Sequence, residues 1–202
     1  MRPPPRKAGR SSTAGGPPRE VRIVGGHWKR SKLPVADSPG LRPTPDRVRE
    51  TLFNWLGQRL DGWRVLDAFA GSGALGFEAA SRGAREVPLL EREPKLVRAL
   101  RAAAERLGAA PPQLQVQQAD AIAWLRAAPP DMQAFDLVLL DPPFDAALLA
   151  PAIAAAAPRI APGGWFYVEA GAPLLPAPPQ GWRVHRQDRA GAVHFQLWRR
   201  EG

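Results

Sequence analysis

The stretch "VLDAFAGSGALGFEAA", Val65 to Ala80, decides the fold. A short apolar run ends at Asp67, a glycine turn follows at Gly71-Ser72-Gly73, and an alanine-rich stretch of helical character comes next. Glycines allow a tight turn and a close approach of the backbone to a ligand, and the first amides of a helix are free to bind it. The stretch therefore predicts a strand, a turn and a helix that hold a nucleotide-like cofactor.

Short apolar runs and helical stretches alternate around this turn, which implies an α/β fold with a parallel sheet covered on both faces. The pattern predicts strands near 64–68, 86–91, 113–117, 136–141 and 164–169, and helices near 73–82, 94–107, 120–127 and 145–157. Pro88 removes one ladder donor, so we place it near the start of its strand. Residues 182–200 alternate around Ala190-Gly191 and predict an antiparallel hairpin.

The beginning of the chain differs in composition from the rest. Residues 1–20 are rich in proline, glycine, serine and arginine and have almost nothing to bury, so we expect a disordered basic arm. "VRIVGGHWKRSKLPV", residues 21–35, predicts a small hairpin that turns at Gly25-Gly26.

A helix is predicted from "TPDRVRETLFNWL", residues 44–56, with Thr44 as its N-cap and Pro45 at its first position. Its apolar stripe leaves Arg47 and Arg49 outside. We expect one catalytic domain at 61–202, preceded by the arm and by a docking segment, which we define as residues 21–60.

Basic charge is concentrated in the first 50 residues. They carry 12 basic and 4 acidic side chains, a net +8 out of +9, so the remaining 152 residues (16 basic, 15 acidic) carry +1. A near-neutral body with a basic N-terminal quarter indicates a polyanionic partner, because lysine and arginine that neutralise phosphates release counterions. A solubilising tail is the alternative.

Several classes are disfavoured by composition. The chain has no cysteine, and its three histidines, His27, His185 and His194, lack metal-ligand spacing, so we expect no metal. It has no apolar run long enough for a membrane span and no signal-peptide core, which predicts a cytoplasmic protein. We also expect a monomer.

Two cofactors fit the glycine turn. Gly71, Gly73 and Gly76 satisfy G-x-G-x-x-G, and Glu91 ends the next predicted strand, where an acid could hold ribose hydroxyls. A nicotinamide dinucleotide has little need for Asp67, whereas the ammonium and sulfonium of S-adenosylmethionine favour a carboxylate beside the turn. Asp120 could accept from the adenine amino group or cap a helix. The expected donor-binding residues are Asp67, Phe69, Gly71, Ser72, Gly73, Glu91, Asp120 and Ala121.

A second loop, in "LVLLDPPFD" (residues 137–145), ends the fourth predicted strand beside the transferable methyl group. An exocyclic amine on a base is a poor nucleophile because its lone pair is delocalised into the ring. Asp141 and the carbonyl of Pro142 would each accept one amine hydrogen and orient the lone pair, Pro143 would stiffen the loop, and Phe144 would stack on the base.

Three stretches together give a resemblance. "RIVGGHWKRSKLPVADSPGLRPTPDRVRETLFNWL", "LDAFAGSGALGFEAASRGA" and "LDPPF" are similar to the bacterial 16S ribosomal RNA guanine-N2 methyltransferases. The resemblance covers about residues 21–200 and implies a seven-stranded methyltransferase fold, S-adenosylmethionine as donor and 16S rRNA as substrate, within an assembling or assembled small subunit. It also implies that Asp67, Gly71 and Gly73 form the donor loop, Glu91 is the ribose acid, Asp120 lies on the adenine side, and residues 141–144 form the catalytic loop.

The basic residues of the docking segment would then meet RNA phosphates, with His27 and Trp28 stacking on bases. The phosphate contacts expected are Arg22, Lys29, Arg30, Lys32, Arg42, Arg47 and Arg49. The same catalytic loop would serve a DNA adenine or cytosine amino methyltransferase. A nicotinamide-dependent oxidoreductase would use the glycine turn but leave "DPPF" without a role, and a non-catalytic RNA-binding module would keep only the fold.

Overall fold

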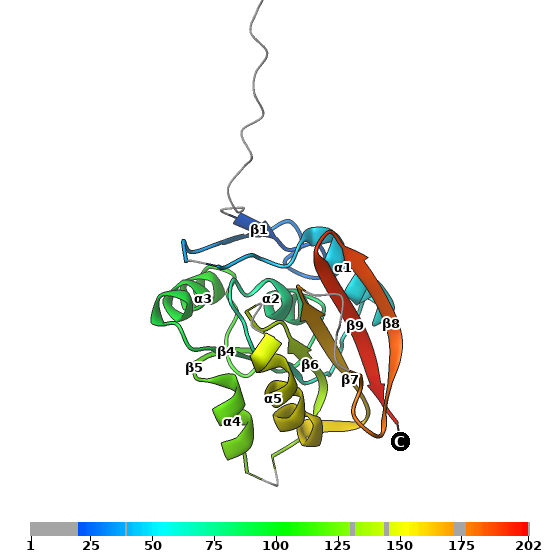
Figure 1. The fold of residues 1–202 in the computed structure, drawn as a ribbon. Helices are drawn as coiled ribbons and strands as arrows, with labels where there is room; N and C mark the ends of the chain where they lie inside the picture. The colour runs from blue at the N-terminus through cyan, green and yellow to red at the C-terminus, as the bar shows by residue number, and fades with distance from the viewer. Residues whose placement is uncertain (1–19, 39, 130–131, 144–145, 172–176, 202) are drawn as a thin grey trace, which may run out of the picture.

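The computed structural model describes residues 20–38, 40–129, 132–143, 146–171 and 177–201 (Figure 1). Residues 1–19 of the predicted arm and Phe144 of the predicted catalytic loop lie outside these ranges. The elements are β1 (Glu20–Arg22), β2 (Lys32–Pro34), α1 (Asp46–Trp55), β3 (Val65–Asp67), α2 (Ala74–Ser81), β4 (Val87–Glu91), α3 (Pro94–Arg106), β5 (Leu114–Gln118), α4 (Ala121–Ala127), β6 (Phe135–Leu140), α5 (Ala146–Ala156), a 3-10 turn (Ala157–Arg159), β7 (Ile160–Ala170), β8 (Trp182–Ala190) and β9 (Val193–Arg200).

The main sheet has seven strands in the order β5-β4-β3-β6-β7-β9-β8. The first five strands of this order are parallel, and β7–β9 and β8–β9 pair antiparallel, so the predicted parallel sheet with a C-terminal hairpin is confirmed. None of the described helices has the length and apolarity needed to cross a membrane.

Alternation along β6 shows why residues 137–140 of this strand are all apolar. Leu137 and Leu139 face a core shared with α1, α2 and α3, while Val138 and Leu140 face a second core under α4 and α5 (Figure 1). A parallel strand buried on both faces has no position left for a polar side chain. After Asp136, near the start of the strand, the next polar residue therefore appears only where the strand ends.

Pro88 is the second residue of β4, close to its start as expected. On the β5 side it stands opposite Gln115. On the β3 side the pairing consists of the bridge Arg64↔Glu86 and the pair Asp67↔Leu89. Pro88 lies between these two contacts, where its missing amide hydrogen interrupts neither of them.

The docking segment contains the predicted hairpin and helix. β1 and β2 pair antiparallel, but the chain between them spans residues 23–31, so Gly25-Gly26 is not a two-residue hairpin turn. The two glycines instead let the loop approach α2: a Cβ on Gly26 would lie 1.9 Å from the carbonyl oxygen of Ser81. The segment shares the core of the first sheet face through residues such as Ile23 and Phe53.

The predicted cap of α1 is wrong. The helix begins at Asp46, its N-cap is Pro45, and no side chain caps its amides. Thr44 is buried and its hydroxyl makes a different contact, described below.

Arg49 was expected on the solvent side of α1, and this is wrong as well. Its side chain is fully buried and forms an ion pair with Glu78 of α2, Nη1 to Oε2 at 2.9 Å. Glu78 also pairs with Arg82 at 2.8 Å through its other oxygen. We call Arg49, Glu78 and Arg82 the buried ionic cluster. Because it is desolvated, Arg49 cannot contact phosphates.

The buried ionic cluster also binds the hairpin. The amide of Val24 donates to Glu78 Oε2 at 2.9 Å, and Arg49 Nη2 donates to the carbonyl oxygen of Arg22 at 2.8 Å. A buried charge is tolerated when it is paired and its remaining donors and acceptors are satisfied. The cluster therefore joins β1, α1 and α2 into one unit.

Breaking the cluster should destabilise the whole fold. We expect Glu78→Gln to lower the free energy of unfolding by about 3–5 kcal/mol, because two buried guanidinium groups lose their shared carboxylate. Denaturant titration followed by tryptophan fluorescence measures this. Arg59→Ala, which removes an exposed ion pair with Asp61 (2.7 Å), is the control and should leave the midpoint unchanged. A Glu78→Gln protein as stable as the native one would contradict the assignment.

Candidate functional site

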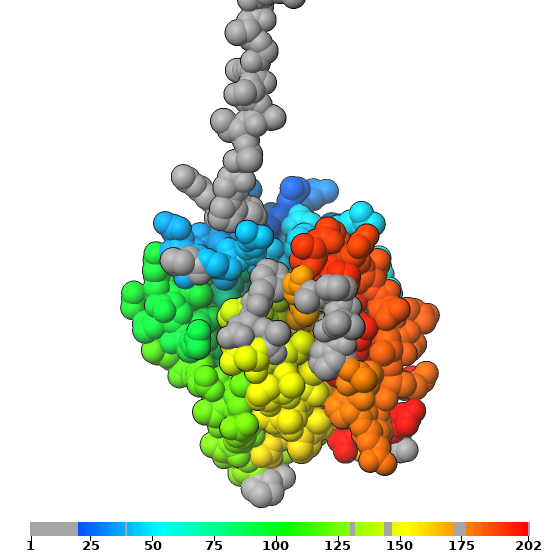
Figure 2. Space-filling view, viewed as in Figure 1, coloured from blue at the N-terminus to red at the C-terminus, as the bar shows by residue number. Residues whose placement is uncertain are grey.

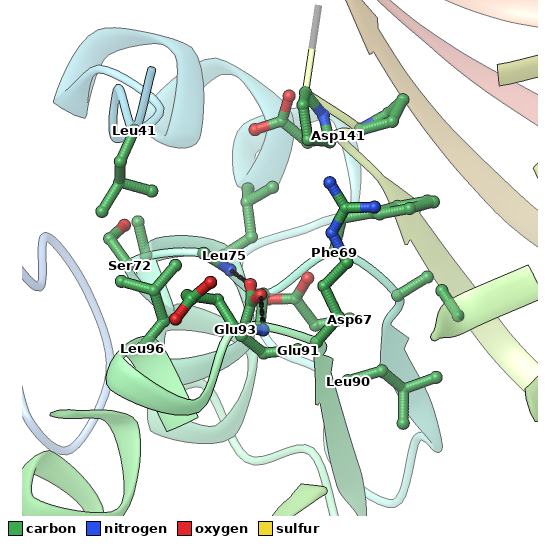
Figure 3. A pocket seen from close by; sticks show the side chains of 18 of the residues that line it. Leu41, Asp67, Phe69, Ser72, Leu75, Leu90, Glu91, Glu93, Leu96 and Asp141 are labelled. Atoms are coloured by element: carbon green, nitrogen blue, oxygen red, sulfur yellow. Dashed lines mark hydrogen bonds between the residues drawn. The ribbon is translucent and has the colours of Figure 1, made fainter. Parts of the chain in front are cut away.

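A pocket of about 410 Å³ lies at the carboxyl ends of the parallel strands (Figure 3). Loops that follow β3, β4, β5 and β6 form most of its wall, as expected for a ligand site of an open α/β sheet. Residues 40–44 of the docking segment complete the wall, which the sequence analysis did not anticipate. The docking segment thus contributes directly to the pocket.

Asp67 occupies the end of β3 with 2% of its surface exposed. Its Oδ2 accepts a hydrogen bond from the amide of Gly76 at 2.9 Å, and a Cβ on Gly76 would lie 2.8 Å from the same oxygen, so this position requires glycine. Burial raises the pKa of Asp67 to about 7; the Gly76 amide opposes the rise, and the charges of Asp141 and Glu91 add to it. A cation bound in the pocket would favour the ionised form.

Glu91 fixes the glycine turn to the end of β4. Its Oε2 accepts from the amide of Gly71 at 2.9 Å and its Oε1 from the amide of Glu93 at 2.8 Å. Each carboxylate oxygen has two lone pairs, so both oxygens can accept further bonds. Figure 3 shows Glu91 beside Asp67 on one side of the pocket.

The glycine turn itself requires glycine at two positions. Gly71 and Gly73 have φ of +52° and +80°, and a Cβ on Gly73 would lie 2.6 Å from both Leu100 and Phe77. Gly73 is the N-cap of α2, so the predicted helix follows the glycine turn directly. Ser72 between them lines the pocket.

Asp120 is the N-cap of α4, because its Oδ1 accepts from the amide of Ala123 at 2.8 Å. It also lines the pocket, so both roles considered from the sequence remain open to it. Ala121 is buried next to it, and Phe69 and Leu90 add apolar surface to the same wall. A flat aromatic ring with polar edges would fit between such groups.

Asp141 follows β6 and lies across the pocket from Asp67 and Glu91 (Figure 3). Its Oδ2 accepts a hydrogen bond from Thr44 Oγ1 at 3.2 Å. Burial raises the pKa of Asp141 to about 7, and the bond from Thr44 opposes the rise. Pro142 and Pro143 also line the pocket. The structure brings the predicted donor residues, except Gly73, into one pocket with the described part of the predicted catalytic loop.

A buried hydrogen-bonded pair, Tyr167 and Glu169, lies next to Asp141 and was not predicted from the sequence. The hydroxyl of Tyr167 donates to Glu169 Oε2 at 2.8 Å, and burial raises the pKa of both groups. Leu140 pairs with Val168 in register, so Glu169 is the strand neighbour of Asp141. Glu169 ends the apolar run "WFYVE", residues 165–169, just as Asp141 follows the apolar run at 137–140. The same sequence pattern could therefore have identified it. Despite these acids, the described ranges contain no group of three or more acids and histidines that could hold a metal ion.

The candidate RNA-binding side chains divide into two groups. Those exposed on the docking segment are Arg22, His27, Lys29, Arg30, Lys32, Arg42 and Arg47. Trp28 is a correction: it is 8% exposed and packs in the core, with its ring centroid 6.3 Å from that of Phe77. Its indole is not available for base stacking. Figure 2 shows the docking segment, coloured from blue to cyan, between α3 and the C-terminal hairpin at one end of the molecule.

Comparisons with known proteins agree with this geometry. The chain is 40% identical over 191 residues to "Ribosomal RNA small subunit methyltransferase D" of Escherichia coli strain K12, covering 90% of this chain and 91% of that protein. It is 39% identical over 181 residues to the protein of the same name from Haemophilus influenzae, with 89% and 93% covered. A solved structure of a putative methyltransferase from Escherichia coli superposes with a TM-score of 0.78 at 38% identity, covering 90% of this chain and 98% of that one.

These relatives favour a methyltransferase over the nicotinamide-dependent oxidoreductase, and the predicted fold class, that of S-adenosylmethionine-dependent methyltransferases, is confirmed. A family model described as "Conserved hypothetical protein 95" matches residues 21–199. The resemblance inferred from the three sequence stretches is confirmed with it. The chain belongs to this family and is an enzyme of the ribosomal RNA small-subunit methyltransferase kind.

Proposed function

We propose that the protein transfers a methyl group from S-adenosylmethionine to the exocyclic N2 amine of a guanine in 16S rRNA, in the cytoplasm. The observation that carries the proposal is the arrangement of one pocket with two chemically different sides. Asp67 and Glu91 lie on one side, beside the glycine turn, and Asp141 with the two prolines lies across from them. The first side suits a cationic donor with a ribose, and the second suits an amine.

The residues present fit the proposed donor. Asp67 is a buried acid whose pKa is raised to about 7, so a nearby ammonium or sulfonium would relieve the cost of its ionisation. Glu91 would accept from ribose hydroxyls, and Asp120 from the adenine amino group. S-adenosylmethionine bound there would supply an electrophilic methyl group at the Asp141 side of the pocket.

Asp141 and the main-chain carbonyl of Pro142 would hold the guanine amine. Each accepts one N–H, which directs the nitrogen lone pair toward the methyl group. As the nitrogen gains the methyl group, the sulfur–carbon bond breaks, and the extra proton of the amine leaves to Asp141 or to water. A carboxyl group whose pKa lies near 7 is suited to accepting that proton at neutral pH.

The docking segment would hold the RNA through the exposed basic side chains of its hairpin. Phosphate contacts carry no sequence information, so they would position the RNA while the pocket selects the base. The boundary that we draw at residue 60 separates two proposed functions, RNA binding by the docking segment and methyl transfer by the catalytic domain. It is not a break in packing, because both share one core.

Donor choice is tested by calorimetry. S-adenosylmethionine or its demethylated product should bind, and NAD should not. Glu91→Gln should weaken donor binding by about 1–3 kcal/mol, the cost of replacing a charged acceptor of hydrogen bonds by a neutral one. The control is Glu105→Gln, an exposed change on α3 at a residue that does not line the pocket. Tight NAD binding, or equal donor affinity in the Glu91 variant, would refute the donor assignment.

Asp141 should act in the chemical step rather than in donor binding. We expect Asp141→Ala to slow single-turnover methylation by roughly 100-fold or more, as for the loss of one positioned electrostatic group, with donor affinity nearly unchanged. In the native enzyme the rate should fall as the pH drops below about 7, because Asp141 takes up a proton. A native rate that does not depend on pH in this range would argue against the role.

Salt dependence tests the docking segment. The triple variant Arg22→Gln, Lys29→Gln, Arg30→Gln should reduce the log–log salt slope of RNA binding by up to about 2, since each phosphate contact to a single strand contributes about 0.7. Removal of residues 1–19 should change the slope by roughly 1 to 3 while turnover at saturating RNA survives. Arg126→Gln, an exposed change on α4, is the control. An unaltered slope in the triple variant would remove the hairpin from the RNA interface.

The substrate itself is identified by tritiated methyl transfer to unmodified small subunits, naked 16S rRNA and duplex DNA, followed by nucleoside analysis. The proposal expects N2-methylguanine from the RNA substrates. Methylated adenine or cytosine from DNA would establish the rival amino methyltransferase, and RNA binding without any methyl transfer would leave a binding module.

A further inference from the structure

Thr44 is a buried polar residue with no role in the chemistry described above. It is 4% exposed and lies in the docking segment, far along the chain from the catalytic loop. Its hydroxyl is not used to cap α1, although it stands two residues before that helix. Instead it crosses to the pocket wall and donates to Asp141 Oδ2 at 3.2 Å.

The main chain around Thr44 is held in place. Pro43 and Pro45 flank it, and the residue before a proline is restricted to extended conformations. The carbonyl oxygen of Thr44 accepts a hydrogen bond from Nε of the buried Arg49 at 3.2 Å. The position of the hydroxyl is therefore determined by proline geometry and by the buried ionic cluster.

The same arginine also reaches the hairpin. While its Nε holds Thr44, its Nη2 donates to the carbonyl oxygen of Arg22, and its Nη1 pairs with Glu78. A guanidinium is planar, so these three contacts fix one another's geometry. A continuous set of hydrogen bonds thus runs from the hairpin through Arg49 and Thr44 to Asp141.

We propose that Thr44 is a positioning residue for the methyl transfer, holding one carboxylate oxygen of Asp141 so that the other is presented to the amine. This inference rests on the proposed function and goes beyond it by assigning a catalytic contribution to the docking segment. Arg49 sets the place of Thr44 and links it to the hairpin. The docking segment then has two tasks: it binds RNA on its outer surface and orients the catalytic acid on its inner surface.

The surroundings of Asp141 make this hydrogen bond important. The charge of Asp141 raises the pKa of Asp67 from β3 and of Tyr167 and Glu169 from β7, so it lies close to two acids and a phenol. Arg42 and Arg92 line the same pocket. Burial raises the pKa of Asp141 to about 7, and the Thr44 bond lowers it. Loss of the hydroxyl therefore both frees the carboxylate to rotate and makes its ionised form less stable.

Thr44→Val tests the proposal because it keeps the shape of the side chain and removes only the hydroxyl. We expect the single-turnover rate at about pH 7 to fall by about tenfold, and the acidic limb of the rate profile to move up by about one pH unit, the scale of one hydrogen bond to a charged group. Donor affinity measured by calorimetry should not change. Thr44→Ser keeps the hydroxyl and should restore most of the rate and the position of the limb.

A double-mutant cycle separates positioning from a general structural effect. In an Asp141→Asn background, Thr44→Val should have almost no further effect on the rate, whereas damage to folding would slow both backgrounds equally. If Thr44→Val is too unstable to assay, Thr44→Ala in the two backgrounds gives the same comparison, normalised to the donor-binding fraction.

The outcomes distinguish the two levels of inference. A native protein that does not methylate RNA would refute the proposed function. A Thr44→Val protein with native rate and pH profile, in an active enzyme, would refute the positioning role alone. Equal slowing by Thr44→Val in both Asp141 backgrounds would also overturn it.

Discussion

The fold of this protein depends on one buried carboxylate, Glu78, shared by two buried arginines. A charge in this position is stable only if its partners stay in place, because removing one of them leaves the others desolvated and unpaired. The partners come from both parts of the chain: Arg49 from the docking segment and Arg82, the C-cap of α2, from the catalytic domain. The docking segment is therefore part of the folded domain and is not a separate module attached to it.

This constraint changes how RNA binding can be dissected. Removal of residues 1–35 would take away Val24 and Arg22, whose backbone groups satisfy Glu78 and Arg49. Loss of methylation in such a truncation would then have two causes, because buried charged groups would lose their hydrogen-bond partners and RNA contacts would be removed. Point changes at exposed basic residues leave the cluster intact, so they measure RNA contacts alone.

The sequence predicted the sheet well because local and global signals agree there. Apolar runs such as 137–140 are buried on both faces, and the acids that end β3 and β4 or directly follow β6 are the first polar residues after these runs. Errors occurred at Thr44, Arg49 and Trp28, where a local rule was overruled by contacts over 29 to 97 positions in the chain or by the packing of the core. No periodicity in a single sequence reports which buried arginine has a buried partner.

The acids at the carboxyl edge of the sheet explain why chemistry is located there. Asp67 and Glu169 are buried and Asp141 is half-buried, and desolvation raises the pKa of all three, so this edge of the sheet favours the protonated acids over the charged ones. A cationic donor would supply the missing positive charge beside Asp67. Burial also disfavours the ionised form of Asp141, and the hydrogen bond from the hydroxyl of Thr44 on the docking segment opposes this effect. The donor would thus stabilise the negative charge of Asp67, and the docking segment stabilises that of Asp141, on the other side of the same pocket.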